Sequence, residues 1–330
     1  MTVVEPTFPI RNAPRSAKRA LFIVFVVLCV SVPAAIPART GGEGARLRYR
    51  FKPGASYAIV VGLDLAMETQ VEGLPPEAAA LAEVGKDMKQ QSSLKLHLEA
   101  SAPGADGSQP LTLRVDDAQA KLSTAGRVVR MQGLEERLEG SILLAGTLSS
   151  DGRAIELAPR SDADIPDASR EIVGLLLQLL PSFPDRELAL GESFEVPVQF
   201  AAPGMGADVK LETHGTCVYT LRSVAAGRAR FDVRAEGTAD SSGDPTQKMT
   251  MKVDNHGTAE FDLAEGIFTT LRSELSIGLF LDTDLPSSAA DPSGTPLDFT
   301  PNAPPRKLEV HASAKGPLEF AMVRVPAEAK

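Results

Sequence analysis

The sequence predicts a mainly β protein, in which long antiparallel strands form a half-barrel or a two-layer sandwich around one buried apolar helix. The first observation is the alternation of apolar and polar residues, as in residues 94–98 (LKLHL), where a period of two places every leucine on one face. The second is the Gly, Pro and Asp residues between these stretches, since such residues favour turns. The third is an apolar run at residues 168–180, which interrupts the alternation.

The alternating stretches, in chain order, give the expected strands. The first, residues 47–51 (LRYRF), places Leu47, Tyr49 and Phe51 on one face. The others are expected at residues 56–67, 94–100, 111–122, 128–131, 141–148, 154–157, 192–200, 209–224, 228–239, 249–263, 267–281, 308–314 and 318–325. The last two are separated by an expected turn at residues 315–317, because this segment contains a Gly-Pro pair.

Two segments depart from the strand pattern. Residues 77–90 follow a Pro-Pro pair and begin with Glu77, whose negative charge suits the first turn of a helix, so a short helix is expected there. Residues 283–305 are rich in Pro, Ser, Asp and Ala, and are expected to form a flexible loop.

The apolar run at residues 168–180 is expected to be a helix buried on several sides. Asp167 can accept hydrogen bonds from the first free amides, and Pro181 ends the helix. The run is apolar nearly all round, whereas a surface helix would show one apolar stripe. If the sheet encloses a ligand cavity, the residues expected to line it are Leu175, Leu176, Leu179 and Leu180.

The N-terminus predicts export. A basic region is followed by an apolar run and small residues near Ala38, which is typical of a signal peptide over residues 1–38. The alternative is an uncleaved anchor at residues 20–38, because the run is close to the length of a membrane span. Residues 39–45 are expected to be a linker and residues 46–330 one β-rich domain. A short internal match leaves two accounts open: chance similarity among β-hairpins, or two similar halves, 46–160 and 185–282, joined by the helix.

Composition argues against a nucleic-acid partner and against a fold held together by disulfide bonds. The net charge of −9 and the pI of about 5.1 argue against nucleic acid. The chain has no Trp and three Tyr, so its core must consist mainly of aliphatic residues and Phe. Only Cys217 remains after removal of the signal, which leaves no intramolecular disulfide.

No pattern in the sequence indicates catalysis or the binding of a cofactor or metal. His214 and Cys217 are three residues apart, so a strand would place them on opposite faces, which opposes a zinc site or a Cys-His pair. There is no Gly-x-Ser-x-Gly sequence, and the Asp-Thr-Asp sequence at 282–284 lacks the later ligands of a calcium loop. We therefore expect no enzyme, cofactor or metal.

The sequence Gly191-Glu192-Ser193-Phe194, together with the hairpin that contains Gly257, Phe261-Asp262 and Gly266, resembles a family of uncharacterised exported β-rich bacterial proteins. The resemblance covers most of residues 46–282 and implies a signal peptide, long strands and a mid-chain apolar helix, without catalytic residues. More distantly, the layout is similar to that of periplasmic lipoprotein carriers, whose half-barrels bind acyl chains.

Three hypotheses about function follow. The first is a non-enzymatic binding or structural module of the cell envelope, located in the periplasm or outside the cell. The second is a periplasmic carrier of a lipid or another apolar ligand. The third is a hydrolase whose site the sequence does not reveal. The expected partner is an apolar ligand or an envelope protein, and the membrane is contacted only through the N-terminal segment if it is uncleaved.

Overall fold

The structure is a computed structural model that describes residues 44–73, 87–124, 127–130, 142–159, 176, 179–197, 210–242, 247–285 and 306–326. The predicted signal peptide, most of the linker and residues 286–305 of the predicted loop lie outside these ranges. The strands are β1 (Ser56–Glu72), β2 (Met88–Ala100), β3 (Gln109–Thr124), β4 (Arg127–Arg130), β5 (Ile142–Leu148), β6 (Ile155–Pro159), β7 (Ser193–Pro197), β8 (Lys210–Ala225), β9 (Arg228–Ser242), β10 (Gln247–Asp262), β11 (Ile267–Leu285) and β12 (Arg306–Val325).

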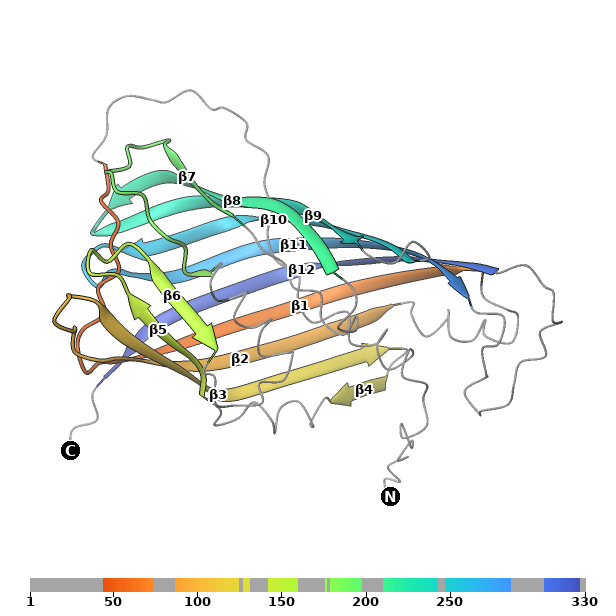
Figure 1. Cartoon of the computed structure of the whole chain (residues 1–330), viewed down its shortest axis with the longest axis horizontal. Helices are drawn as coiled ribbons and strands as arrows, with labels where there is room; N and C mark the ends of the chain where they lie inside the picture. The colour runs from red at the N-terminus through yellow and green to blue at the C-terminus, as the bar shows by residue number, and fades with distance from the viewer. Residues whose placement is uncertain are drawn as a thin grey trace, which may run out of the picture.

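All these strands belong to one antiparallel sheet (Figure 1). Eleven of them follow the order β6-β5-β3-β2-β1-β12-β11-β10-β9-β8-β7, and β4 pairs with β3 beside this path. The first and last strands therefore meet in the middle, whereas β6 and β7, which are consecutive in the chain, lie at opposite edges. The similarity of the two halves expected from the sequence stays a prediction.

The sheet is curved, because a short segment joins two hairpin turns that lie far apart in the strand order. The Tyr49 N–H donates to Gly152 O (2.7 Å) in the β5–β6 turn, and the Arg50 N–H donates to Gly266 O (3.1 Å) in the β10–β11 turn. Adjacent residues span only about 3.5 Å, so the two carbonyl oxygens lie within about 10 Å of each other. In a flat sheet, six strand spacings of about 4.8 Å would separate these turns by about 29 Å. The sheet must bend to bring them together, and it curves without closing.

Alternation along the strands gives the sheet an apolar inner face and a polar outer face. On β10, the inward side chains Met249, Met251 and Val253 are buried, whereas the intervening Lys252 is exposed. The outer face carries ion pairs such as Arg222–Asp232 (2.6 Å) and Lys95–Asp117 (2.9 Å). Exposed pairs of this kind contribute at most about 1 kcal/mol each, so the fold depends mainly on the inner face.

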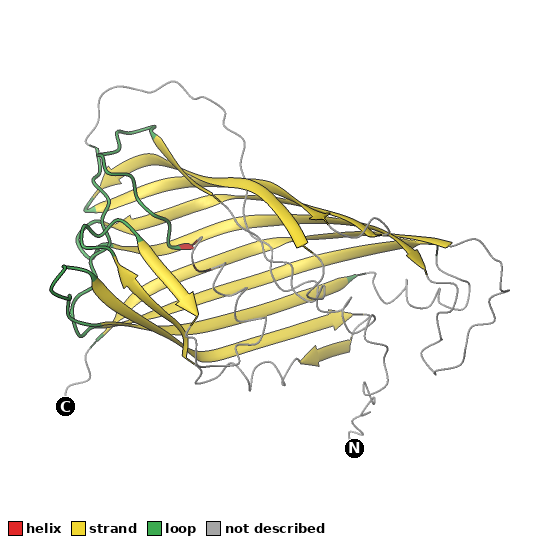
Figure 2. Cartoon of the chain, viewed as in Figure 1, coloured by secondary structure: helices red, strands yellow, loops and turns green. Residues whose placement is uncertain are grey.

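The structure confirms the mainly β class and corrects two architectural expectations. The two-layer sandwich is wrong, because a single curved sheet replaces it (Figure 2). Residues 47–51 are extended but pair with no strand in the described ranges, since they cross the end of the sheet and contact its turns. Of the predicted helix at residues 168–180, the structure describes Leu176, Leu179 and Leu180, where the Leu180 N–H donates to Leu176 O (3.0 Å) in one helical turn.

Three expected boundaries are wrong as well. Residues 88–90 belong to β2 rather than to the predicted helix at 77–90, the rest of which lies largely outside the described ranges. Residues 283–285 extend β11 into the predicted loop at 283–305. The expected turn at residues 315–317 is instead in the middle of β12, and all three residues pair with β11.

The two edges of the path end in short strands that contain proline. β6 and β7 have five residues each and end at Pro159 and Pro197. Proline lacks the N–H that another strand would need, and short edge strands reduce pairing between molecules. These two strands therefore present few free N–H groups to another molecule.

Gly316 is needed where β12 passes closest to β1, and we predict that Gly316→Ala destabilises the fold. A Cβ atom at this position would lie 1.9 Å from Asp64 O, so the backbones would have to separate. The expected loss is about 1–3 kcal/mol of unfolding free energy, measured by urea denaturation. The matched variant is Gly62→Ala on β1, where a Cβ atom meets nothing within 4 Å. Equal urea midpoints for the two variants would contradict this account.

Candidate functional site

The inner face of the sheet is the candidate site, because it is a broad surface without charge. The inward positions of β1, β2, β9, β10 and β11 in the described ranges, and those of β12 from Leu308 onward, carry no Asp, Glu, Lys, Arg or His. Leu65, Leu275 and Phe320 on three of these strands are at most 2% exposed. Such a surface can bind apolar groups by excluding water, and it offers no charged group for acid–base chemistry.

One end of this face is filled by a cluster of aromatic rings, which we call the aromatic plug. Its members are Tyr49, Phe51, Tyr57, Phe183, Phe194, Tyr219, Phe231, Phe261 and Phe268. Ring centroids lie 4.5 Å apart for Tyr49 and Phe183, and 5.0 Å apart for Phe194 and Tyr219. Rings at these separations attract one another beyond the effect of their burial, so the plug is a fixed wall rather than a ligand cavity.

Two segments outside the sheet supply the centre of the plug. Residues 44–52 and 179–192 bridge at Ala45 and Leu188, whose backbones exchange two hydrogen bonds of 2.8 and 2.9 Å. The Tyr49 hydroxyl donates to Pro181 O (2.9 Å), and the Phe183 N–H donates to Arg153 O (2.9 Å) beside β6. These segments close the end of the curved sheet that lies at the left of Figure 1. Burial raises the pKa of the Tyr49 phenol well above its ordinary value, because the phenolate would lose its hydration.

Farther from the plug, the apolar side chains of β11 and β12 are less completely covered, whereas Met249, Met251 and Val253 of the neighbouring β10 stay buried. Along β11, Leu271 and Leu275 are 4% and 0% exposed, whereas the inward residues Ile277, Leu279 and Leu281 are only half-buried. On β12, the corresponding inward positions hold small or half-buried residues, namely Leu308, Val310, Ala312 and Ala314. Apolar side chains with incomplete cover at this end are the feature expected of a surface that accepts a ligand.

The leucines predicted from the sequence to line a ligand lie near the plug. Leu176, Leu179 and Leu180 are 0%, 3% and 2% exposed and belong to the same apolar cluster as the inner face. Leu175 lies outside the described residues. Their burial is as expected, and their contact with a ligand stays a prediction. The sequence did not indicate that Tyr49 and Phe183 would meet, because residues about 130 positions apart share no local signal.

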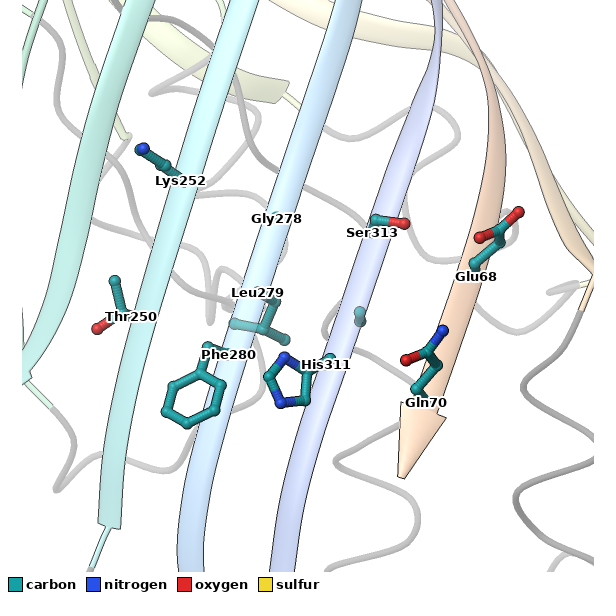
Figure 3. A pocket seen from close by; sticks show the side chains of 10 residues that line it. Glu68, Gln70, Thr250, Lys252, Gly278, Leu279, Phe280, His311 and Ser313 are labelled. Carbon is teal, nitrogen blue, oxygen red and sulfur yellow. The ribbon is translucent and has the colours of Figure 1, made fainter. Parts of the chain in front are cut away.

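The outer face has two hollows, with volumes of about 430 and 630 Å³, that share Lys252, Gly278 and Ser313. Figure 3 shows the smaller one, in which the Phe280 and His311 rings meet edge to face with centroids 4.9 Å apart. Glu68 and Gln70 of β1 lie at its other side (Figure 3). Charged side chains line both hollows, so an apolar ligand suits the inner face better than these.

The described residues contain no group of three or more His, Cys, Asp and Glu side chains that could hold a metal ion. His214 is exposed and Cys217 is buried, as expected for two residues on opposite faces of one strand. Within the part of the chain that the structure describes, no helix has the length and apolar character needed to cross a bilayer.

Comparison with known proteins gives likenesses of fold only. No protein-family model and no curated protein sequence matches the chain, so its expected membership of an exported family stays a prediction. A solved structure of lipovitellin, which describes lipid–protein interactions in that protein, aligns with 85% of this chain at 12% identity and a TM-score of 0.39. The chain spans only 26% of that lipovitellin chain. An outer membrane channel from Pseudomonas putida F1 aligns with 84% of this chain at 8% identity, covering 98% of the channel, with a TM-score of 0.22.

We predict that Tyr49→Phe destabilises the protein at neutral pH and that the difference from the wild type shrinks at alkaline pH. Loss of the hydroxyl leaves the buried Pro181 carbonyl without its partner, at a cost of about 1–3 kcal/mol. Because the folded-state pKa of Tyr49 is raised, wild-type stability is complete below pH about 10 and falls as the pH rises beyond it. Urea unfolding between pH 7 and 11 measures both effects, and a difference that stays constant over this range would contradict the second.

Proposed function

We propose that this chain is a non-enzymatic binding protein whose inner sheet face holds an apolar ligand, such as the acyl chain of a lipid. The observation that carries the proposal is the change along β11 from fully buried Leu271 and Leu275 to half-buried Ile277, Leu279 and Leu281. Apolar side chains that are left half-covered on a concave face can gain further burial from an apolar ligand.

The dimensions of the face favour a long ligand. The ten-residue interval between Leu271 and Leu281 spans about 33 Å at 3.3 Å per residue. Burial of one methylene group contributes about 0.8 kcal/mol, whereas association costs about 4–15 kcal/mol. A ligand therefore needs on the order of ten or more methylene groups before it binds measurably, which favours long acyl or alkyl chains over small apolar molecules.

The proposal extends to the role and the location of the protein. Binding without catalysis is supported by the uncharged residues at the described inward positions of β1, β2 and β9–β11, and of β12 from Leu308 onward. Export to the periplasm or beyond the cell is supported by the basic and apolar N-terminal sequence, which is typical of a signal peptide. A carrier or binding module in an aqueous compartment needs such an enclosed apolar surface to hold a ligand that water does not dissolve.

The test compares two glutamate substitutions at neighbouring positions of β11. Leu279→Glu places a charge on the inner face, whereas Phe280→Glu, the matched control, places the same charge on the outer face. Both side chains are half-buried in the wild type. We expect Leu279→Glu to weaken binding of a fluorescent long-chain fatty acid at least tenfold, because the charge must be desolvated, and Phe280→Glu to change it less than twofold.

The measurement is fluorescence titration of the purified full chain, with circular dichroism to show that each variant is folded. Native mass spectrometry of wild-type protein from an expressing cell adds the identity of any co-purifying lipid. Binding that falls equally in both variants would place the ligand elsewhere. A folded wild type that binds no long-chain probe would overturn the proposal.

A further inference from the structure

Among the residues that the structure describes, three buried polar atoms on the inner face have no hydrogen-bond partner: Gln90 Nε2, Asn255 Oδ1 and Ser273 Oγ. Asn255 is 2% exposed and Ser273 is 8% exposed. An unpaired buried polar group costs about 1–3 kcal/mol, so a sequence that keeps several of them on one surface needs a reason. The fourth buried polar side chain, Gln109, shows the ordinary case, because its Nε2 donates to Phe51 O and Ser101 O.

The unpaired atoms lie at one level of the sheet. Asn255 of β10 is opposite Leu275 of β11, which is opposite Gly316 of β12. Gln90 of β2 is opposite Leu65 of β1 in the continuation of the same row. On β10 the row lies six residues from Phe261 of the plug, and on β11 it marks the level at which buried Leu275 gives way to half-buried Ile277.

Asn255 and Ser273 form a pair. Ser273 is opposite Gly257, which is two residues from Asn255 on the same strand, so the two side chains are diagonal neighbours. Diagonal Cβ atoms in an antiparallel sheet lie roughly 7 Å apart. A Cβ atom at Gly257 would lie 2.5 Å from Ser273 Cβ, so this position requires glycine and Ser273 packs directly against the β10 backbone. One small group can therefore reach both oxygens.

The two oxygens specify what that group must be. Asn255 Oδ1 only accepts a hydrogen bond, whereas the Ser273 hydroxyl both donates and accepts. A hydroxyl group satisfies both, because it donates to Oδ1 and accepts from the serine. A carboxylate cannot donate, and the described inward positions of β1, β2 and β9–β11, and of β12 from Leu308 onward, hold no cation to neutralise it. An ammonium group would find no Asp or Glu at these inward positions to neutralise its charge.

We propose that Asn255 and Ser273 bind the hydroxyl group of a neutral lipid or long-chain alcohol whose apolar part lies along the inner face. This inference rests on the proposed function and adds the polar group that the ligand carries. Pockets for small molecules are commonly apolar with a few polar groups that set the orientation of the ligand, and this pair would set the depth at which the hydroxyl end stops.

The experiment measures binding of three probes of equal chain length to the purified full chain: 1-hexadecanol, hexadecyl methyl ether and hexadecane, each supplied from cyclodextrin. The wild type is expected to bind the alcohol at least tenfold more tightly than the alkane, with the ether in between because it accepts but cannot donate. Asn255→Leu and Ser273→Ala are each expected to remove most of this preference while leaving alkane affinity within twofold. The matched control is Ser276→Ala, on the outer face of β11, with no change expected.

A second readout separates binding from a structural role. Asn255→Leu replaces an unpaired buried amide by an apolar side chain of similar shape, so its urea midpoint is expected to stay equal or rise. A lower midpoint with an unchanged probe preference would make Asn255 structural and overturn the inference.

The probes also distinguish failure of the hydroxyl site from failure of the proposed apolar binding function. If the wild type binds all three equally, the hydroxyl site is wrong, a buried water satisfies the pair, and the apolar binding function stands. If the preference for the alcohol persists in both Asn255→Leu and Ser273→Ala, the hydroxyl is bound elsewhere and the inference also fails. If the folded wild type binds none of the probes, the proposed function fails with it.

Discussion

The shape of this protein depends on two backbone hydrogen bonds made by consecutive residues. Tyr49 and Arg50 bind the carbonyl groups of Gly152 and Gly266, which belong to hairpin turns six strand spacings apart. Both glycines have positive φ, of 71° and 67°, and a Cβ atom at Gly266 would lie 2.6 Å from Arg50 N. The turns can therefore approach the crossing segment only because they carry glycine there. A sheet held at one end in this way must curve, and its curvature creates the concave apolar face.

The topology explains why the closed end is built from segments outside the sheet. The chain enters the sheet at its centre with β1 and leaves it at the centre with β12, so the connection from β6 to β7 has to run from one edge to the other. Its described part contacts Arg153 beside β6 through Phe183 and Leu221 of β8 through Gly191. The same crossing brings Phe183 against Tyr49 and completes the aromatic plug. The connection from β6 to β7 therefore both links the two edges of the sheet and forms part of the wall of the candidate site.

Local sequence patterns predicted the strands but not their assembly. Alternation located β9 and β10 to within a few residues, because inward and outward positions differ in polarity along each strand. It could not show that β1 pairs with β12 or that the sheet bends, since both depend on contacts between distant residues. The Gly-Pro pair at 316–317 has the local signature of a turn, yet pairing with Leu275 and Glu274 of β11 keeps it within a strand. Buried leucines were predicted correctly at 176, 179 and 180, whereas Tyr49 carried no signal beyond its inward position.

The polar row on the inner face shows how one surface can serve both folding and selection of a ligand. At every other level, apolar side chains stabilise the curved sheet and would accept any alkyl chain without regard to its end. Asn255 and Ser273 reduce stability in the empty protein because their oxygens are desolvated without a partner. A ligand that supplies the missing hydrogen bonds recovers this loss, whereas a ligand that lacks them does not. Discrimination against the plain alkyl chain therefore comes from the unpaired oxygens of Asn255 and Ser273 in the empty site.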